Sequence, residues 1–224
     1  MKHFTLFLLF ICFSCGKGKV IQLPEIKTAK ITEVFDVSPA YLFYDETQPD
    51  SIELNQKNLI STTNWLVNID KRLYLKQVIP KIKLLQDKKR NAKMHKNEHA
   101  KNYYTCNDTQ IKSLGFIDFT DIVYHKAEKG ILDLDFPLEK ATTVLRVQSL
   151  QVIKIQSTDF QETSTNVNRL IDIVRNHFNA DTTNQAIILA FDKNLTFQDY
   201  ITFKSTLETI NTEGLTIDHR EFIY

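Results

Sequence analysis

The sequence predicts an α+β fold made of two tandem copies of a small sheet with helices packed on one face. Three observations predict it. The stretch "LVNIDKRLYLKQVI" (66–79) has a counterpart 122 residues later, "ILAFDKNLTFQDYI" (188–201). Strand-like and helix-like apolar patterns alternate in the order strand–helix–strand–helix–strand around each stretch. With 42% hydrophobic residues and only five glycines and five prolines in 224 residues, the chain has the composition of packed cores.

Residues 131–224 form the clearer copy. Apolar and polar residues alternate over 144–156, which predicts a strand. Apolar residues recur at helical spacing over 163–178, which predicts a helix with Ser164 or Thr165 as its cap. The apolar run 186–191 is short enough to be a strand buried on both faces.

The same copy then turns and continues into a second helix. Asp192 begins the turn, where we expect its side chain to bond nearby backbone N–H groups. The Thr-x-x-Asp spacing of 196–199 is a capping box and predicts the start of the helix. Gly214 is a natural helix stop, and 215–224 is predicted to be the closing strand.

Residues 23–125 repeat this plan less clearly. Strands are predicted over 40–45 and 65–69, and Asp70 occupies the turn position of Asp192. The helix that follows contains Pro80, which we expect to kink or delay it. The preceding helix is barely visible in "LNQKNLIST".

The closing strand of the first copy is assigned to 114–125, where Gly115 falls against Gly214. The spacing between matched positions drops there from 122 to 99 residues, so the first copy carries 23 extra residues, at about 88–110. The Pro-containing segments 23–29 and 136–143 are interpreted as matching entry segments.

The N-terminus has the features of a bacterial export signal. Residues 1–14 combine a short basic start with an apolar run too short to span a membrane. Cys15 follows in a lipobox-like context, so we expect it to carry lipid and residues 15–22 to act as a tether; an ordinary cleaved signal and an uncleaved anchor are the alternatives. Cys106 would then be alone in the mature chain, as a structural cysteine or a reactive thiol.

An extended segment, an apolar strand ending in Asp-Lys, an apolar helix start, a glycine and a final strand together resemble the periplasmic domain of the ExbD/TolR family. The resemblance is strongest in "AIILAFDKNLTFQDYITFKSTLETINTEGLTI" and weaker over 20–125. It implies dimerising modules that contact partner proteins or the cell wall, in association with a biopolymer transport system. Members of the family have a transmembrane helix with an aspartate; the apolar segment of this chain contains no carboxylate, so a proton-relay role is not expected.

The strongest enzymatic alternative is the run "HKNEH". It matches the H-x-x-E-H pattern, in which His95 and His99 would bind zinc and Glu98 would act as the base of a hydrolase. Such a site needs a helix with a buried face, but its surroundings contain almost no apolar residues. A solvated charged linker is the competing interpretation.

The same region is the most basic part of a chain whose formal net charge is +1. It is either a solubilising loop or a patch for acidic lipids or anionic wall polymers, with the candidate binding residues Lys88, Lys89, Arg90, Lys93 and Lys96.

The expected protein is therefore a non-catalytic, lipid-anchored protein of the cell envelope, periplasmic or associated with the outer membrane. It needs no cofactor or metal, does not bind nucleic acid, and forms an internal pseudo-dimer or a homodimer. Its partner is an envelope protein or peptidoglycan. A second alternative is a lipoprotein adaptor whose likeness to the family is only architectural, and the first copy may serve the second as a scaffold.

Overall fold

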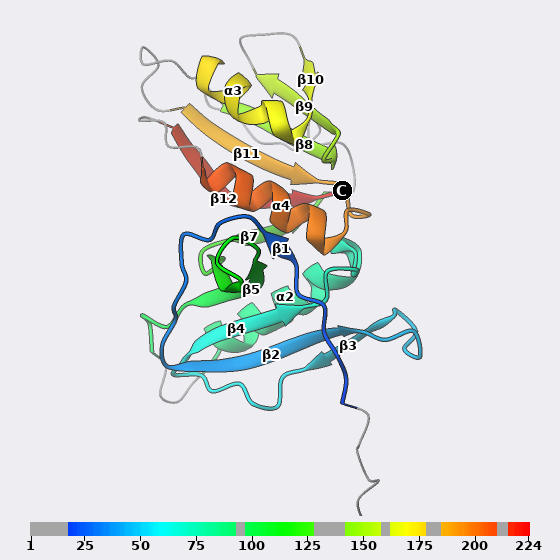
Figure 1. Ribbon diagram of the computed structural model, residues 1–224, viewed down its shortest axis with the longest axis vertical. Helices are drawn as coiled ribbons and strands as arrows, with labels where there is room; N and C mark the ends of the chain where they lie inside the picture. Colours follow the sequence, from blue (N-terminus) through cyan, green and yellow to red (C-terminus); the bar gives the residue numbers. More distant parts are fainter. Residues whose placement is uncertain (1–17, 93–96, 128–141, 158–161, 178–184, 210–214) are drawn as a thin grey trace, which may run out of the picture.

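The computed structural model describes residues 18–92, 97–127, 142–157, 162–177, 185–209 and 215–224. It is an α+β fold with two mixed sheets, as the sequence predicts (Figure 1). The first sheet consists of β1 (Glu25–Ile26), β2 (Val37–Tyr44), β3 (Ile52–Asn55), β4 (Asn64–Ile69), β5 (Asn102–Asp108) and β6 (Ser113–Asp118). The second consists of β7 (Val123–Lys126), β8 (Thr142–Ser149), β9 (Val152–Ser157), β10 (Thr163–Thr165), β11 (Gln185–Phe191) and β12 (Leu215–Ile223). The described helices are α2 (Leu75–Arg90), α3 (Val167–His177) and α4 (Phe197–Glu208).

The two sheets share a strand order. The first runs β1-β5-β4-β2-β3, and the second runs β7-β12-β11-β8-β9 with β10 added at its edge. In each sheet an antiparallel hairpin leads into a parallel strand, and a helix crosses over to the next parallel strand. The sheets are not strict repeats, because β10 and α3 occur only in the second unit and β6 extends only the first sheet.

This topology corrects the predicted end of the first unit. The strand that corresponds to β12 is β5, which lies inside the segment predicted to be a basic insertion at about 88–110. The predicted closing strand over 114–125 is divided between β6, which pairs antiparallel with β5, and β7, which joins the second sheet. The unit boundary therefore falls before Val123 rather than between 125 and 131.

Gly115 has a different role from the one predicted. It lies within β6, opposite Cys106, rather than between a helix and its closing strand. A Cβ atom there would lie 2.4 Å from the Cβ of Ala29, so the close approach of the N-terminal segment requires glycine. Gly214, its predicted counterpart, and most of the predicted entry segment 136–143 lie outside the described residues.

Three other predictions differ from the structure. The strand predicted over 144–156 is the β8–β9 hairpin, since a turn at Leu150-Gln151 interrupts the alternation. In the first unit, no helix precedes β4: residues 56–63 are turns and irregular chain. Pro80, which we expected to kink or delay the helix, does not delay it: α2 begins at Leu75 and continues through Pro80 to Arg90.

The predicted start of the second helix of unit two is confirmed. Thr196 is the N-cap of α4, and its hydroxyl oxygen accepts a hydrogen bond from the N–H of Asp199 (3.1 Å). The Thr196 hydroxyl also donates to the Asp199 carboxylate (2.8 Å). The first bond is the half of the predicted capping box that caps the helix; in place of the second half, in which the backbone N–H of Thr196 would donate to Asp199, the Thr196 hydroxyl donates to that carboxylate.

The two units meet through the turns that precede α2 and α4. The N–H groups of Leu75 and Lys76 donate to the carbonyl groups of Leu195 (2.9 Å) and Lys193 (2.9 Å). In the other direction, the N–H groups of Phe197 and Gln198 donate to the carbonyl groups of Leu73 (2.7 Å) and Lys71 (3.1 Å). Every group has its counterpart 122 residues away, so the contact is isologous.

This exchange satisfies backbone groups that each helix leaves unpaired. The first N–H groups of a helix have no carbonyl partner within the helix. Here the first two N–H groups of α2 are bonded to the turn of unit two, and those of α4 are bonded to the turn of unit one. Each unit therefore completes the helix start of the other.

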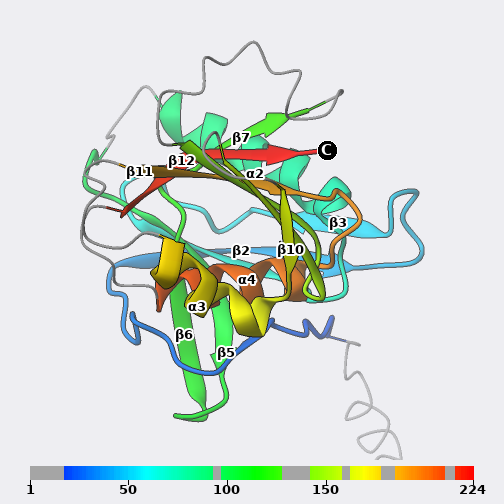
Figure 2. The same cartoon turned by 90° about the horizontal axis from the view of Figure 1, so that it is seen from above.

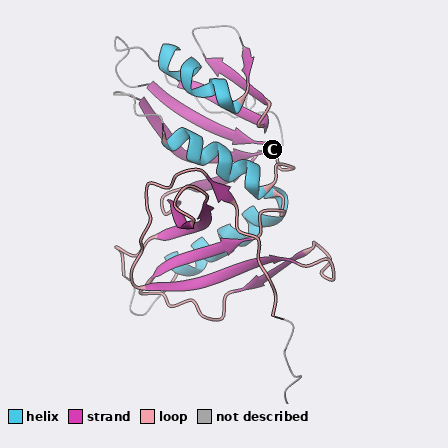
Figure 3. Cartoon of the chain, in the orientation of Figure 1, coloured by secondary structure: helices cyan, strands magenta, loops and turns pink. Residues whose placement is uncertain are grey.

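One hydrophobic cluster extends through both units, whose helices and strands are distinguished by colour in Figure 3. It includes residues of β4 and α2 from the first unit together with residues of β11 and α4 from the second. α3 and α4 lie side by side on one face of the second sheet (Figure 2). The opposite face carries a small second cluster, which contains Val144, Ile188, Ala190 and Phe222.

Candidate functional site

The junction of the units contains a buried polar network. The Tyr104 and Tyr124 hydroxyl groups are 2.6 Å apart, and the Tyr124 and Tyr200 hydroxyl groups are 3.2 Å apart. The Tyr200 hydroxyl donates to the Glu221 carboxylate (2.7 Å), which also pairs with the Lys204 ammonium. Burial raises the pKa of all three tyrosines, so they stay protonated and act as hydrogen-bonding groups.

The network connects the two sheets. Tyr104 comes from β5 of the first sheet, whereas Tyr124 and Glu221 come from β7 and β12 of the second. Lys204 and Tyr200 compensate the charge of Glu221, whose side chain is fully buried. The hydrogen bond between Tyr104 and Tyr124 is the part of this network that crosses between the units, so a shifted arrangement would leave the buried Tyr104 hydroxyl without this partner.

The predicted basic patch is smaller than expected. Lys88 and Arg90 are exposed in the last turn of α2, but Lys89 is buried. The Lys89 ammonium donates to the Lys101 carbonyl and to the Asn102 side chain, both at 2.9 Å, and lies over the Trp65 ring. Lys93 and Lys96 lie outside the described residues.

Lys89 has an unusual electrostatic environment. Burial lowers the pKa of its ammonium to about 8, against a smaller opposing effect of Asp118. It lines a recess of about 350 Å³ together with Arg90, Glu98 and Asp121. Two basic and two acidic side chains line this recess, so it presents no strong field to an anion.

The zinc alternative gains no support from the described part of its motif. Glu98 and His99 lie in a turn after the end of α2, where the Asn97 side chain accepts a hydrogen bond from the N–H of His99 (3.0 Å). The zinc motif needs both histidines one turn apart on a helix. His95 lies outside the described residues, and the described residues contain no group of three or more metal-ligating side chains.

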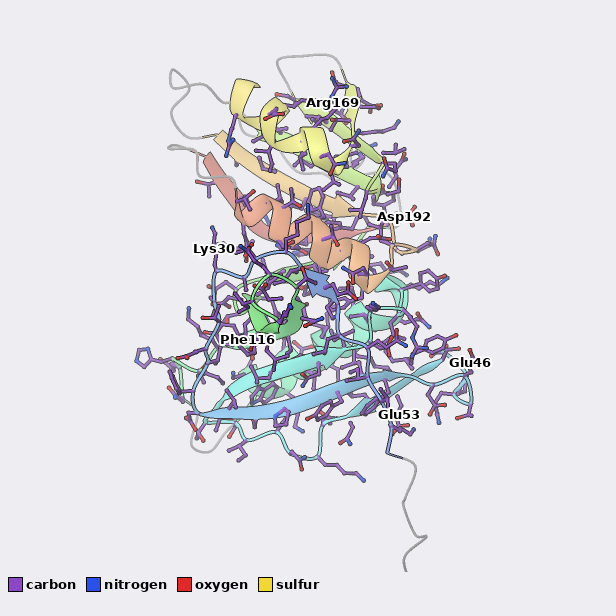
Figure 4. The ribbon with its side chains drawn as sticks, in the orientation of Figure 1. Lys30, Glu46, Glu53, Phe116, Arg169 and Asp192 are labelled. Carbon is purple, nitrogen blue, oxygen red and sulfur yellow. The ribbon has the colours of Figure 1, made fainter. Side chains whose placement is uncertain are left out.

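Asp70 and Asp192 occupy the same position after β4 and β11 (Figure 4 labels Asp192). Each carboxylate accepts a hydrogen bond from the backbone N–H two residues on, from Arg72 (3.1 Å) and from Asn194 (2.7 Å). This is the turn geometry expected from the sequence. Asp70 differs in being fully buried and in pairing with the Arg72 guanidinium through both oxygens (2.8 and 2.9 Å).

The pKa of Asp70 reflects this pairing. Burial by itself would raise the pKa, but the hydrogen bonds from the Arg72 side chain and from the N–H groups of Arg72 and Gln22 outweigh it. The net effect lowers the pKa of the Asp70 carboxyl below its ordinary value. Asp70 is therefore a charged structural anchor of the turn rather than a proton donor.

A groove with a volume of about 890 Å³ lies between α2 and β7. We call it the α2–β7 groove. Its lining consists of Leu75, Lys76, Ile79, Pro80, Lys83, Tyr124, His125, Lys126, Ala127, Lys193, Ile223 and Tyr224.

The remaining predicted features are the cysteines and the segments that could meet a membrane. Cys106 is fully buried in β5, and burial raises the pKa of its thiol, which makes it a structural residue rather than a nucleophile. Cys15 and the signal at 1–14 lie outside the described residues. Among the described helices, none has the length and apolar character needed to cross a bilayer.

The sequence did not indicate the buried network or the α2–β7 groove. The three tyrosines are far apart in sequence. The sequence around a buried tyrosine also does not show whether its hydroxyl group has a hydrogen-bond partner. The groove residues come from α2, β7, the second Asp-Lys turn and the C-terminus, so only the correct unit boundary would have brought them together.

Comparison with known proteins yields no match to a family model, a curated protein or a solved structure.

Proposed function

We propose that this chain is a non-catalytic lipoprotein of the bacterial cell envelope, with two ExbD/TolR-like units docked on each other as an internal pseudo-dimer. In this role it binds a partner protein or peptidoglycan outside the cytoplasm, in association with a biopolymer transport system. The observation that supports it best is the reciprocal pairing of the two Asp-Lys turns, because such isologous contacts are typical of dimers.

Linkage in one chain favours this docking. Two modules joined by a short connection meet at an effective concentration in the millimolar range, so a weak dimer contact becomes a stable internal one. Helix starts satisfied by the neighbouring unit and the shared core add to it. The proposed protein therefore uses its self-association surface internally and keeps its outer surfaces for other partners.

The exposed end of α2 is the proposed contact for an anionic partner. Lys88 and Arg90 are exposed there, and Asp87 is the nearby acid that pairs with Arg90 (3.0 Å). Surface ion pairs of this kind are weak, at about 0–1 kcal/mol, so Arg90 can exchange Asp87 for a partner group.

The test uses the mature chain, residues 15–224 with Cys15→Ser, which contains every described element. Light scattering should give the mass of one chain. Three experiments then distinguish the candidate partners. Co-sedimentation with purified sacculi tests peptidoglycan, co-sedimentation with anionic vesicles tests lipid, and crosslinking in intact cells tests a partner protein. We expect Lys88→Glu/Arg90→Glu to weaken the contact and Lys27→Glu/Lys30→Glu, a charge-matched change at other exposed lysines, to leave it intact.

Lipid attachment needs its own experiment. An alkyne-labelled fatty acid should be incorporated into the wild-type chain in bacteria and not into Cys15→Ser. A stable dimer of separate chains, or a Cys15→Ser chain that takes up label as well as the wild type, would contradict the proposal.

A further inference from the structure

The two sides of the unit junction differ in one respect. On the side of α4 and β1, Gln198 exchanges two hydrogen bonds with the backbone of Glu25, at 2.9 and 2.8 Å. The Glu25 carboxylate accepts a hydrogen bond from the Lys71 ammonium (2.7 Å). On this side the residues of the turn and of β1 are therefore joined by hydrogen bonds, and Lys71 has Glu25 as its acidic partner.

On the side of α2 and β7, the residues that correspond to Lys71 and Gln198 are Lys193 and Lys76. Both line the α2–β7 groove. Lys76 donates to the Asn194 side chain (3.1 Å), whereas Lys193 forms no ion pair with another of the described residues. The groove has no Glu25 equivalent, since none of its described lining residues is acidic.

The groove combines cationic and apolar surface. Its cationic side chains include Lys83, whose ammonium donates to the Tyr124 carbonyl (2.7 Å) and keeps two further protons for a ligand. Its apolar lining has Pro80 and Tyr224 with exposed surface, and the buried Leu75, Ile79 and Ile223 form its floor. A volume of about 890 Å³ is within the range of roughly 300–1,000 Å³ that is usual for small-molecule sites.

The environment of His125 agrees with a positive field. Burial lowers the pKa of this imidazole, and the charges of Lys83 and Arg220 lower it further, with Asp218 opposing them. An anion bound nearby would favour the protonated imidazole.

We propose that the α2–β7 groove binds an amphipathic anion with one long acyl chain, of which a fatty-acid carboxylate is the simplest. The carboxylate lies at Lys193, where it takes the place that Glu25 has beside Lys71. The acyl chain lies along the exposed Pro80 and the partly exposed Tyr224, over a floor formed by the core residues of the groove. This site is independent of the proposed envelope role, because it follows from the asymmetry of the junction alone.

Binding is measured with the fluorescent long-chain carboxylate cis-parinaric acid on residues 15–224 carrying Cys15→Ser. Lauric acid should displace the probe. Dodecanol, which has the chain without the charge, and acetate, which has the charge without the chain, should be weaker competitors by at least about tenfold, the equivalent of one ion pair of about 1.4 kcal/mol.

Three variants locate the site. Lys193→Glu should weaken binding at least about tenfold, because it replaces attraction by repulsion. Pro80→Trp should weaken binding by a similar factor, since Pro80 is exposed at the groove and an indole there would fill the groove. This variant should not lower the stability of α2, because it removes a proline from the helix interior. Lys88→Glu, the same charge change at the far end of α2, should leave binding unchanged.

The proposal is overturned if dodecanol competes as well as lauric acid, if Lys88→Glu weakens binding as much as Lys193→Glu, or if Pro80→Trp binds the probe normally. It is also overturned if the folded wild-type protein, verified by circular dichroism, does not bind the probe. An acidic peptide that displaces the probe while lauric acid does not would assign the groove to a protein segment instead.

Discussion

Phe197→Ala should destabilise both units although it lies in the second. Phe197 is the first residue of α4, and its side chain is fully buried. Its ring packs edge-to-face on that of Tyr104 in β5 of the first sheet, with centroids 5.2 Å apart, and stacks on Tyr200 at 5.9 Å. Truncating a buried phenylalanine to alanine costs about 3–5 kcal/mol.

The assay uses the protein's only tryptophan, Trp65, which lies in β4 of the first unit. Its ring is 2% exposed and its Nε1–H donates to the Ile60 carbonyl (2.7 Å), so unfolding of the first sheet changes its fluorescence. With a urea m-value of about 3 kcal/mol/M, the upper end for small proteins, the loss lowers the midpoint by about 1–1.7 M. Fluorescence and far-UV circular dichroism should give the same midpoint.

The reasoning is refuted if Phe197→Ala leaves the Trp65 midpoint at the wild-type value while circular dichroism shows a separate early step. That result would mean that the units fold independently. Val152→Ala is the control: Val152 is also in the second unit but 40% exposed, so its free energy of unfolding should change by less than about 0.5 kcal/mol.

Three further outcomes follow from the site. Because the pKa of Asp70 is lowered in the folded state, its contribution to stability is present above the ordinary pKa of about 3.9 and is lost as the pH falls through the folded-state pKa. Urea unfolding at pH 6 and pH 3 should therefore show that the free energy of unfolding falls less for Asp70→Asn than for the wild type. Burial lowers the pKa of Lys89 to about 8, so the unfolded chain binds the proton more tightly than the folded one. The free energy of unfolding of the wild type, relative to that of Lys89→Met, should therefore rise between pH 8 and about 10.4. A difference that does not change with pH would contradict the burial of the Lys89 ammonium. Zinc should not change the Tm of the wild type or of His99→Ala in thermal unfolding scans, whereas a zinc-dependent rise that His99→Ala abolishes would revive the hydrolase alternative.

The local signals in the sequence predicted the second unit well. The apolar run of β11, the helix cap at Thr196 and the turn at Asp192 each depend on neighbouring residues, and each is present where the sequence places it. The recurrence of "LVNIDKRLYLKQVI" also identified the two segments that meet at the junction, since the paired backbone groups lie within these stretches.

The strand pairing could not be predicted in the same way. β5, "NYYTCND", is polar at both ends and follows a charged run, so its central position in the sheet depends on β4 and β1 and not on its own pattern. The match of Gly115 with Gly214 placed the end of the unit too late, and β7 was assigned to the wrong sheet. Removing 88–110 as a linker would delete β5, so point variants are the appropriate test of the basic residues.

Disulfide formation between Tyr74→Cys and Thr196→Cys tests the docked pair of units most directly. The two positions face each other in an antiparallel bridge between the turns. The hydrogen bonds between the turns are formed by the residues on either side of them, so the two positions are a non-hydrogen-bonded pair of an antiparallel ladder. The Cα atoms of such a pair are about 4.5 Å apart, within the range of about 4.4–6.8 Å that a disulfide spans. In residues 15–224 with Cys15→Ser, Cys106 is buried and does not compete. We predict rapid oxidation to a crosslinked monomer at every protein concentration; a chain that stays reduced, or that forms only disulfide-linked dimers, would contradict the docking.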